Sequence, residues 1–133
     1  MKYKIDSPVM VILPRKTKKD KRYSLNLNTF RNAHYLVNNQ AKHIYKELME
    51  TKLKGKVFKT PIELTFTLFK KTRRRSDRAN VLSIVEKFLC DAMVEYGCIE
   101  DDADEFITSQ HYYSGEIDSN NPRVEIVITE LDK

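Results

Sequence analysis

The sequence contains little of what builds several classes of protein. Its two cysteines and three histidines show no zinc-site spacing. Cys90 and Cys98 lie in or beside one predicted helix, so reduced thiols are a better interpretation than a disulfide. There is no apolar run of about 18 residues or more, and with 3 glycines and 4 prolines no segment is of low complexity. Because Met1–Leu13 also lack a secretory hydrophobic region, we expect one cytoplasmic domain without a membrane span.

What the sequence does contain is charge, and the charge is unevenly distributed. Residues 1–78 hold 21 Lys or Arg and 6 Asp or Glu, a balance of +15, whereas residues 79–133 hold 3 and 13, a balance of −10. Such asymmetry in one small domain indicates a polyanion such as nucleic acid as the partner of one surface, although pairing between the two halves is an alternative. Two basic runs supply the candidate DNA-binding residues, which are Arg15, Lys16, Lys18, Lys19, Lys21, Arg22, Lys70, Lys71, Arg73, Arg74, Arg75 and Arg78.

Hydrophobic periodicity predicts a single α+β domain over residues 1–133. Apolar residues at three- and four-residue spacing indicate helices, and strict alternation indicates half-buried strands. We expect a small mixed sheet with two packed helices in the order β-α-β-α-β-β. The predicted elements are a strand over 7–13, a basic loop over 14–28, a helix over 29–53, a strand over 62–70, a helix over 79–96, and strands over 105–113 and 123–131.

The second predicted helix lies between carboxylates. Asp77 precedes it, and Asp101 and Asp102 follow it. A solvated helix face with Asp77 as the N-cap is one interpretation. If the acids at the two ends converge, their oxygens favour Mg²⁺ or Mn²⁺ beside a cationic surface, which is a layout for phosphodiester hydrolysis. A helical wheel also places four polar side chains in one stripe opposite the apolar face: Asn80, Ser83, Lys87 and Asp91.

Four segments, in their order along the chain, resemble the signature of the RusA family of Holliday junction resolvases. They read RRRSDRAN, EKFLCDAM, YG and EDD, and the earlier LPRKTKKDKRYSLNLNTFRN is similar to phage-borne members. The resemblance implies a homodimer, bacterial or phage-encoded, that acts in DNA recombination and repair. It implies binding to branched DNA, namely four-way junctions, and cutting with Mg²⁺ or Mn²⁺ and no small-molecule cofactor.

The resemblance also assigns roles to particular residues. Asp77, Lys87 and Asp102 match catalytic positions of the family, and Asn80 matches its supporting asparagine. The spacing from Asn80 to Lys87 is longer than in the family by four residues, about one helical turn, which keeps Lys87 on the same helix face.

One presumed ligand is missing, because Ala79 stands where the family has its second acid. Glu86 or Asp91 could replace it, and the sequence leaves that choice open. The candidate metal ligands are therefore Asp77, Asp102, Glu86, Asp91 and Asp101. Two other functions remain as alternatives: a non-catalytic protein that binds branched DNA, which Ala79 would permit, and an RNA-binding domain built on basic loops.

Overall fold

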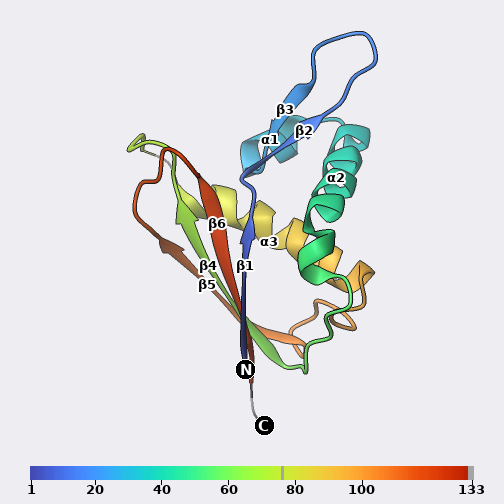
Figure 1. Cartoon of the computed structure of the whole chain (residues 1–133), viewed down its shortest axis with the longest axis vertical. Coiled ribbons are helices and arrows are strands. Elements are labelled where there is room, and N and C mark those ends of the chain that lie inside the picture. Colours follow the sequence, from blue (N-terminus) through green and yellow to red (C-terminus); the bar gives the residue numbers. More distant parts are fainter. Residues whose placement is uncertain (76, 132–133) are drawn as a thin grey trace.

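The computed structural model describes residues 1–75 and 77–131, and residues 76, 132 and 133 lie outside this description. Within the described residues, no helix is long and apolar enough to cross a membrane. Figure 1 shows the elements, which are β1 (Lys2–Ser7), β2 (Met10–Leu13), β3 (Lys21–Ser24), α1 (Leu27–Asn32), α2 (Tyr35–Leu53), β4 (Ile62–Phe69), α3 (Arg78–Glu95), β5 (Ile107–Ser114) and β6 (Arg123–Glu130).

Four strands form one mixed sheet in the order β1-β6-β4-β5. The central strand β4 alternates buried residues, Ile62, Leu64, Phe66 and Leu68, with half-buried ones, as a strand with one covered face does. It pairs antiparallel with β6 and parallel with β5. A parallel pair needs a crossover connection, and α3 supplies it between β4 and β5.

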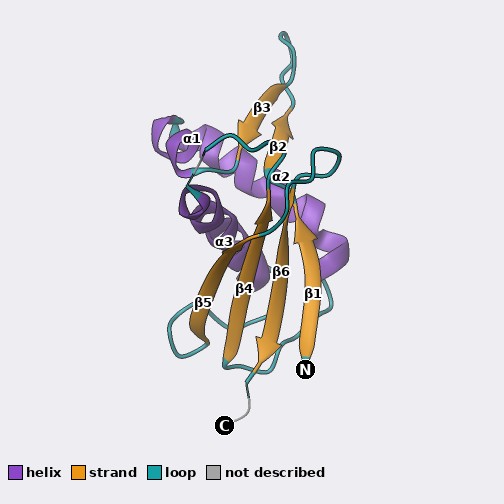
Figure 2. Cartoon of the chain, turned by 90° about the vertical axis from the view of Figure 1, so that its left-hand side faces the viewer, coloured by secondary structure: helices purple, strands orange, loops and turns teal. Residues whose placement is uncertain are grey.

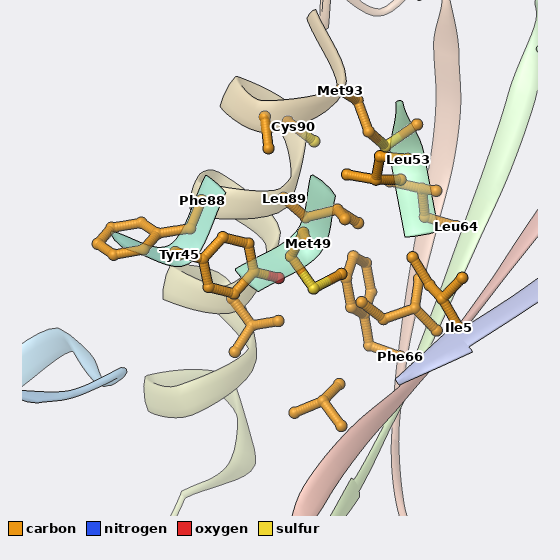
Figure 3. Close-up of a cluster of buried hydrophobic side chains, with 14 of the residues drawn as sticks. Ile5, Tyr45, Met49, Leu53, Leu64, Phe66, Phe88, Leu89, Cys90 and Met93 are labelled. Carbon is orange, nitrogen blue, oxygen red and sulfur yellow. The ribbon is translucent and has the colours of Figure 1, made fainter. Parts of the chain in front are cut away.

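The helices cover one face of this sheet and leave the other face open (Figure 2). The core lies between sheet and helices and includes Phe66 of β4, Tyr45 and Met49 of α2, and Phe88 and Leu89 of α3 (Figure 3). Eight of the 18 residues of α3 are buried, because α1 and α2 pack on it as well as the sheet. Helix α3 is therefore held firmly, and its remaining polar positions have fixed directions.

Strands β2 and β3 form a separate hairpin beyond the end of the sheet (Figure 1). Its last pair joins Leu13 to Lys21, which leaves residues 14–20 as the connecting loop. Buried Tyr23 anchors the hairpin to α2, because its hydroxyl donates a hydrogen bond to Oδ1 of Asn38 at 2.6 Å. The base of the hairpin is thus fixed, and its basic loop extends away from the rest of the molecule (Figure 2).

The fold class predicted from the sequence is confirmed, since the chain is a small α+β domain with a mixed sheet. The predicted order of elements agrees roughly, and the differences lie near the N-terminus. The strand expected over 7–13 is divided, because Pro8 has no N–H to offer a strand ladder. β1 therefore ends at Ser7 and β2 begins at Met10, while β1 and β3 were not predicted as strands.

The helix expected over 29–53 is two helices. Ala33 is extended (φ −83°, ψ 148°) and ends α1. His34 is the N-cap of α2, and its Nδ1 accepts a hydrogen bond from the N–H of Leu36 at 3.2 Å. The break allows α1 to pack on α3 independently of α2.

Candidate nucleic-acid interface and acidic site

One cleft is lined by cations from both basic runs, one from the first run and four from the second. Arg22 of β3 lies on one side, and Lys70, Lys71, Arg74 and Arg75, from the loop between β4 and α3, lie on the other. The cleft has a volume of about 750 Å³, within the range of ligand sites. No Asp or Glu is among the described residues that line it. We call it the cationic cleft.

Short hydrogen bonds hold the loop that carries most of these cations. The Oγ1 of Thr72 accepts from the N–H of Arg74 at 3.3 Å. The carbonyl of Lys70 accepts from the N–H of Asp118 at 2.8 Å, which ties this loop to the segment between β5 and β6. Arg123 in turn donates to Oδ2 of Asp118 at 2.9 Å. The positions of the cleft cations therefore depend on both connections at this end of the sheet.

Gly115 allows the segment after β5 to approach β4 closely. A Cβ added at this position would meet ring carbons of Phe69 at 2.6–2.8 Å, so no larger residue fits without displacing the ring. The guanidinium of Arg123 lies 4.1 Å from the centroid of the same ring. Ser119, Asn120 and Pro122, in the same connection between β5 and β6, line the cationic cleft.

The other predicted DNA-binding residues do not line the cationic cleft, and most of them lie in the hairpin loop that extends away from the rest of the molecule (Figure 2). In the hairpin loop, Nε of Arg15 donates to the carbonyl of Lys19 at 2.7 Å, which closes the loop on itself. Arg78, in the first turn of α3, donates to Oγ of Ser114 at 3.3 Å. These cations, all exposed, are Arg15, Lys16, Lys18, Lys19, Lys21, Arg73 and Arg78.

Asp77 is the N-cap of α3. Its Oδ1 accepts a hydrogen bond from the N–H of Ala79 at 2.9 Å, and its carbonyl accepts from the N–H of Asn80 at 3.1 Å. Asp77 and Asn80 are both exposed. No interaction of the described residues joins Asp77 to Asp102.

Asp102 lies instead near Glu86, which is half-buried in the middle of α3. The hydroxyl of Tyr112 on β5 donates to Oε1 of Glu86 at 2.6 Å. Burial raises the pKa of Glu86 above its ordinary value of 4.5, the hydrogen bond from Tyr112 lowers it, and the nearby charge of Asp102 raises it. Burial and the bond to Glu86 both raise the pKa of Tyr112, so its hydroxyl stays protonated as a donor. We call Glu86 and Asp102 the acidic pair.

Two further predicted residues point to the other side of α3. The ammonium of Lys87 lies 5.8 Å from the centroid of the Phe30 ring on α1. The carboxylate of Asp91 forms an ion pair with Lys42 of α2, with Nζ and Oδ2 at 3.4 Å. Asp91 is thus engaged in an ion pair between α2 and α3, on a different side of α3 from Glu86.

Helix geometry explains why Asp77 lies apart from the acidic pair. Nine residues separate it from Glu86, which is about 13 Å along a helix axis. Within the part of the chain that the structure describes, no group of three or more His, Cys, Asp or Glu side chains could hold a metal ion. Asp101 is exposed beside the acidic pair, and its Oδ1 accepts a hydrogen bond from the N–H of Asp102 at 2.8 Å.

The sequence reasoning did not identify Tyr112 as the partner of Glu86. The register places Tyr112 opposite Phe66, whose side chain is buried under the helices, so Tyr112 faces α3. The alternation of side chains along β5 indicates that Tyr112 faces α3, but only once the parallel pairing of β5 with β4 is known. Cys90, the other neighbour of the acidic pair, is buried, and burial together with the charges of Glu86 and Asp102 raises the pKa of its thiol.

Comparison with known proteins gives no family. No protein-family model matches this chain, and no curated protein matches it significantly. The cationic cleft, the acidic pair and the motif resemblance are therefore the observations from which its function is inferred.

Proposed function

We propose that this protein is a metal-dependent endonuclease that binds branched DNA at the cationic cleft. The observation that carries the proposal is that both basic runs contribute cations to this cleft. Cations far apart in sequence, Arg22 and four of the five between Lys70 and Arg75, line one cleft with no carboxylate among its described lining residues. Such an arrangement favours a phosphate backbone, whose contacts provide most of the affinity of proteins for DNA.

The acidic pair has the donor chemistry that Mg²⁺ or Mn²⁺ prefers. Mg²⁺ in phosphate-processing sites commonly takes one or two carboxylates and completes its shell with water and substrate phosphate. Burial and the nearby charge of Asp102 disfavour the ionised form of Glu86, as its raised pKa indicates, and a divalent cation would offset both effects. Glu86 and Asp102 would therefore hold the ion, with Asp101 adjacent.

Within this proposal the side chains have separate tasks. Tyr112 fixes the orientation of Glu86 by its hydrogen bond. The cations of the cleft hold the phosphates of the substrate. When bound, the divalent ion supplies activation of water and neutralisation of charge on the phosphate that is attacked.

The motif resemblance to RusA-family resolvases supports the choice of substrate and chemistry. It favours four-way junctions as the branched DNA, a homodimer as the active form, and Asp102 as a ligand. The proposal departs from the family pattern at two points: Glu86 supplies the carboxylate that the resemblance would place at Ala79, and Asp77 serves as the N-cap of α3 rather than as a ligand. The resemblance also makes Lys87 catalytic, but its ammonium lies over the Phe30 ring on another side of α3, so the proposal gives it no role at the acidic pair.

A second candidate is a branched-DNA-binding protein without catalysis. The observation that favours it is the lack of a group of three metal-binding side chains among the described residues. Binding of structured RNA is the remaining alternative, and the same basic surface would serve it.

The experiment is incubation of the protein with a mobile four-way DNA junction, with and without Mg²⁺. The proposal expects paired cuts across the junction that require the metal. Tight junction binding without cuts in either Mg²⁺ or Mn²⁺ would favour the non-catalytic candidate. Stronger competition by structured RNA than by linear or branched DNA would favour the RNA-binding alternative.

A further inference from the structure

The floor of the cationic cleft is apolar, in contrast to its rim. Val9 and Met10 at the start of the hairpin, Leu68 at the end of β4, and Val81 in the first turns of α3 line it together with buried Leu25. Val9, Leu25, Leu68 and Val81 belong to or pack on the hydrophobic core. The cleft is therefore a place where the core reaches the surface between two cationic walls.

A phosphodiester backbone alone does not account for this floor. Phosphates gain from the rim, but bringing a charged group onto apolar surface removes its hydration without compensation. A nucleobase has the opposite preference, because its flat face is favourably buried against apolar side chains while the phosphates on either side stay at a cationic rim. The cleft offers both kinds of surface side by side.

We propose that the cationic cleft receives one unstacked nucleotide of the bound DNA. The base lies on the floor formed by Met10, Leu68 and Val81, and the flanking phosphates lie against Arg22 on one wall and Arg74 on the other. Exposed Ser24 and Asn120 at the edge of the cleft offer polar groups to the edge of the base. The charge of the walls and the lack of carboxylates among the described lining residues favour this occupant over an apolar peptide or a cationic ligand.

The occupant must be unpaired, because a base in an intact duplex is stacked on both sides and its faces are not accessible. Branch points, bulges and single-stranded ends supply such a nucleotide with little loss of stacking. The inference rests on the proposed binding of DNA at this cleft, and it adds a structural reason for preferring branched over linear DNA.

The test compares three DNA probes that differ only at one position: a linear duplex, the same duplex with one bulged thymidine, and the same bulge with an abasic nucleotide. The abasic probe keeps every phosphate and removes only the base. We expect the thymidine bulge to bind about tenfold more tightly than the abasic bulge, the scale of burying one base on apolar surface. Equal affinities for the two bulges would overturn the inference.

A matched pair of variants locates the effect. Val81 and Val94 are both partly buried valines of α3 packed on the core, and only Val81 lines the cationic cleft. Val81→Phe should fill the floor and abolish the preference for the thymidine bulge over the abasic bulge, whereas Val94→Phe should keep the preference. Met10→Gln, which keeps the side-chain length, should weaken the preference in the same direction, and unfolding temperatures identify any variant that has lost its fold.

Failure of this inference is distinguishable from failure of the proposed function. If Arg74→Gln with Arg75→Gln lowers affinity for the linear duplex but Val81→Phe keeps the bulge preference, DNA binds at the rim and no base enters the cleft. If the arginine substitutions leave the affinity for all three probes unchanged, the cleft does not bind DNA and both proposals are wrong.

Discussion

The segments at the two ends of α3 carry opposite charges. Each charge is the opposite of the one that the helix dipole favours at that end. Six Lys or Arg lie between Lys70 and Arg78 at its N-terminus, and five Asp or Glu lie between Glu100 and Glu105 in the loop after it. A helix dipole favours the opposite arrangement, with anions at the N-terminus and cations at the C-terminus. Apart from Asp77 at the N-cap, α3 follows neither preference, since its first turn contains no acid and its last turn no base.

These charges therefore suit ligands better than they suit helix stability. An incoming phosphate is an anion that suits a helix N-terminus surrounded by cations. A divalent cation suits a carboxylate-rich loop. Helix α3 would connect a region that binds DNA, at its N-terminus, to the acidic pair, whose Glu86 lies about 13 Å along the helix axis from Asp77. Substitutions in each region test whether the two have these separate tasks.

The largest effect is expected in the acidic region. Glu86→Gln and Asp102→Asn should each lower the rate of junction cleavage by about a hundredfold or more, because each removes a charge that acts directly on the reaction. Junction binding without metal should be unchanged or tighter, since a repelling carboxylate is gone. The double variant should lose little more than either single variant. Asp91→Asn is the control, because Asp91 pairs with Lys42 on another side of α3, and its cleavage rate should stay near wild type.

Substitutions in the basic region should lower junction cleavage less than those in the acidic region do. They should weaken DNA binding more. Replacing Arg73, Arg74 and Arg75 by Gln should weaken binding to every DNA sequence. It should also reduce the slope of log affinity against log salt by about one for each phosphate that the variant no longer neutralises. The control removes three charges elsewhere, at Lys2, Lys54 and Lys56, which are exposed outside the cationic cleft. A control that lowers the slope as much as the arginine variant would show that only total charge matters.

Substitutions of Asp77 test whether this residue only caps α3 or also belongs to the metal site. Asp77→Ala should lower the free energy of unfolding by about 1 kcal/mol, because it removes the hydrogen bond to the N–H of Ala79. Asp77→Asn should leave both stability and cleavage nearly unchanged, since asparagine is an equally good cap. Urea unfolding and junction cleavage measure the two quantities. If Asp77→Asn instead lowers cleavage about a hundredfold, the ligand assignment implied by the RusA resemblance is right and the acidic pair is incomplete without Asp77.

The smallest effect concerns the pH dependence of stability. The raised pKa of Glu86 means that the folded state binds this proton more tightly than the unfolded state, so its contribution to stability falls as pH rises from 4.5 through the raised pKa. Glu86→Gln should therefore gain stability relative to wild type across that window and match it at lower pH. The substituted glutamine keeps an oxygen that can accept from Tyr112. The measurement is the difference in unfolding temperature against pH, and a difference that does not vary with pH would show that Glu86 is not destabilised by its neighbours.

The fold could be predicted for those helices and strands that bury one face and leave the other exposed, because this produces a regular apolar spacing. The alternation in Ile62–Phe69 indicated the strand, and apolar spacing indicated most of α2 and α3. Local periodicity did not predict the hairpin strand β3, because KRYS has one buried residue, Tyr23, whose burial depends on α2. The break at Ala33–His34 was also missed, since the apolar spacing continues across it.

The candidate site was predicted in composition but not in arrangement. The two basic runs and the acids near α3 were recognised from charge and motif, and the structure places residues of both runs at one cleft. The proximity of Asp102 to Glu86 rather than to Asp77 depends on how the loop after α3 returns along the helix, which no sequence spacing specifies. Asp91, which the sequence left as an equal alternative to Glu86, is distinguished only by its ion pair with Lys42.

The central claim is that Glu86 and Asp102 hold the divalent ion, and titration with Mn²⁺ followed by calorimetry tests it most directly. The account predicts that wild type and Asp77→Asn bind Mn²⁺ with similar affinity, whereas Glu86→Gln and Asp102→Asn each lose at least about tenfold, the range of removing one ligand from a metal site. Affinity that is lost in Asp77→Asn and retained in Glu86→Gln would contradict the account.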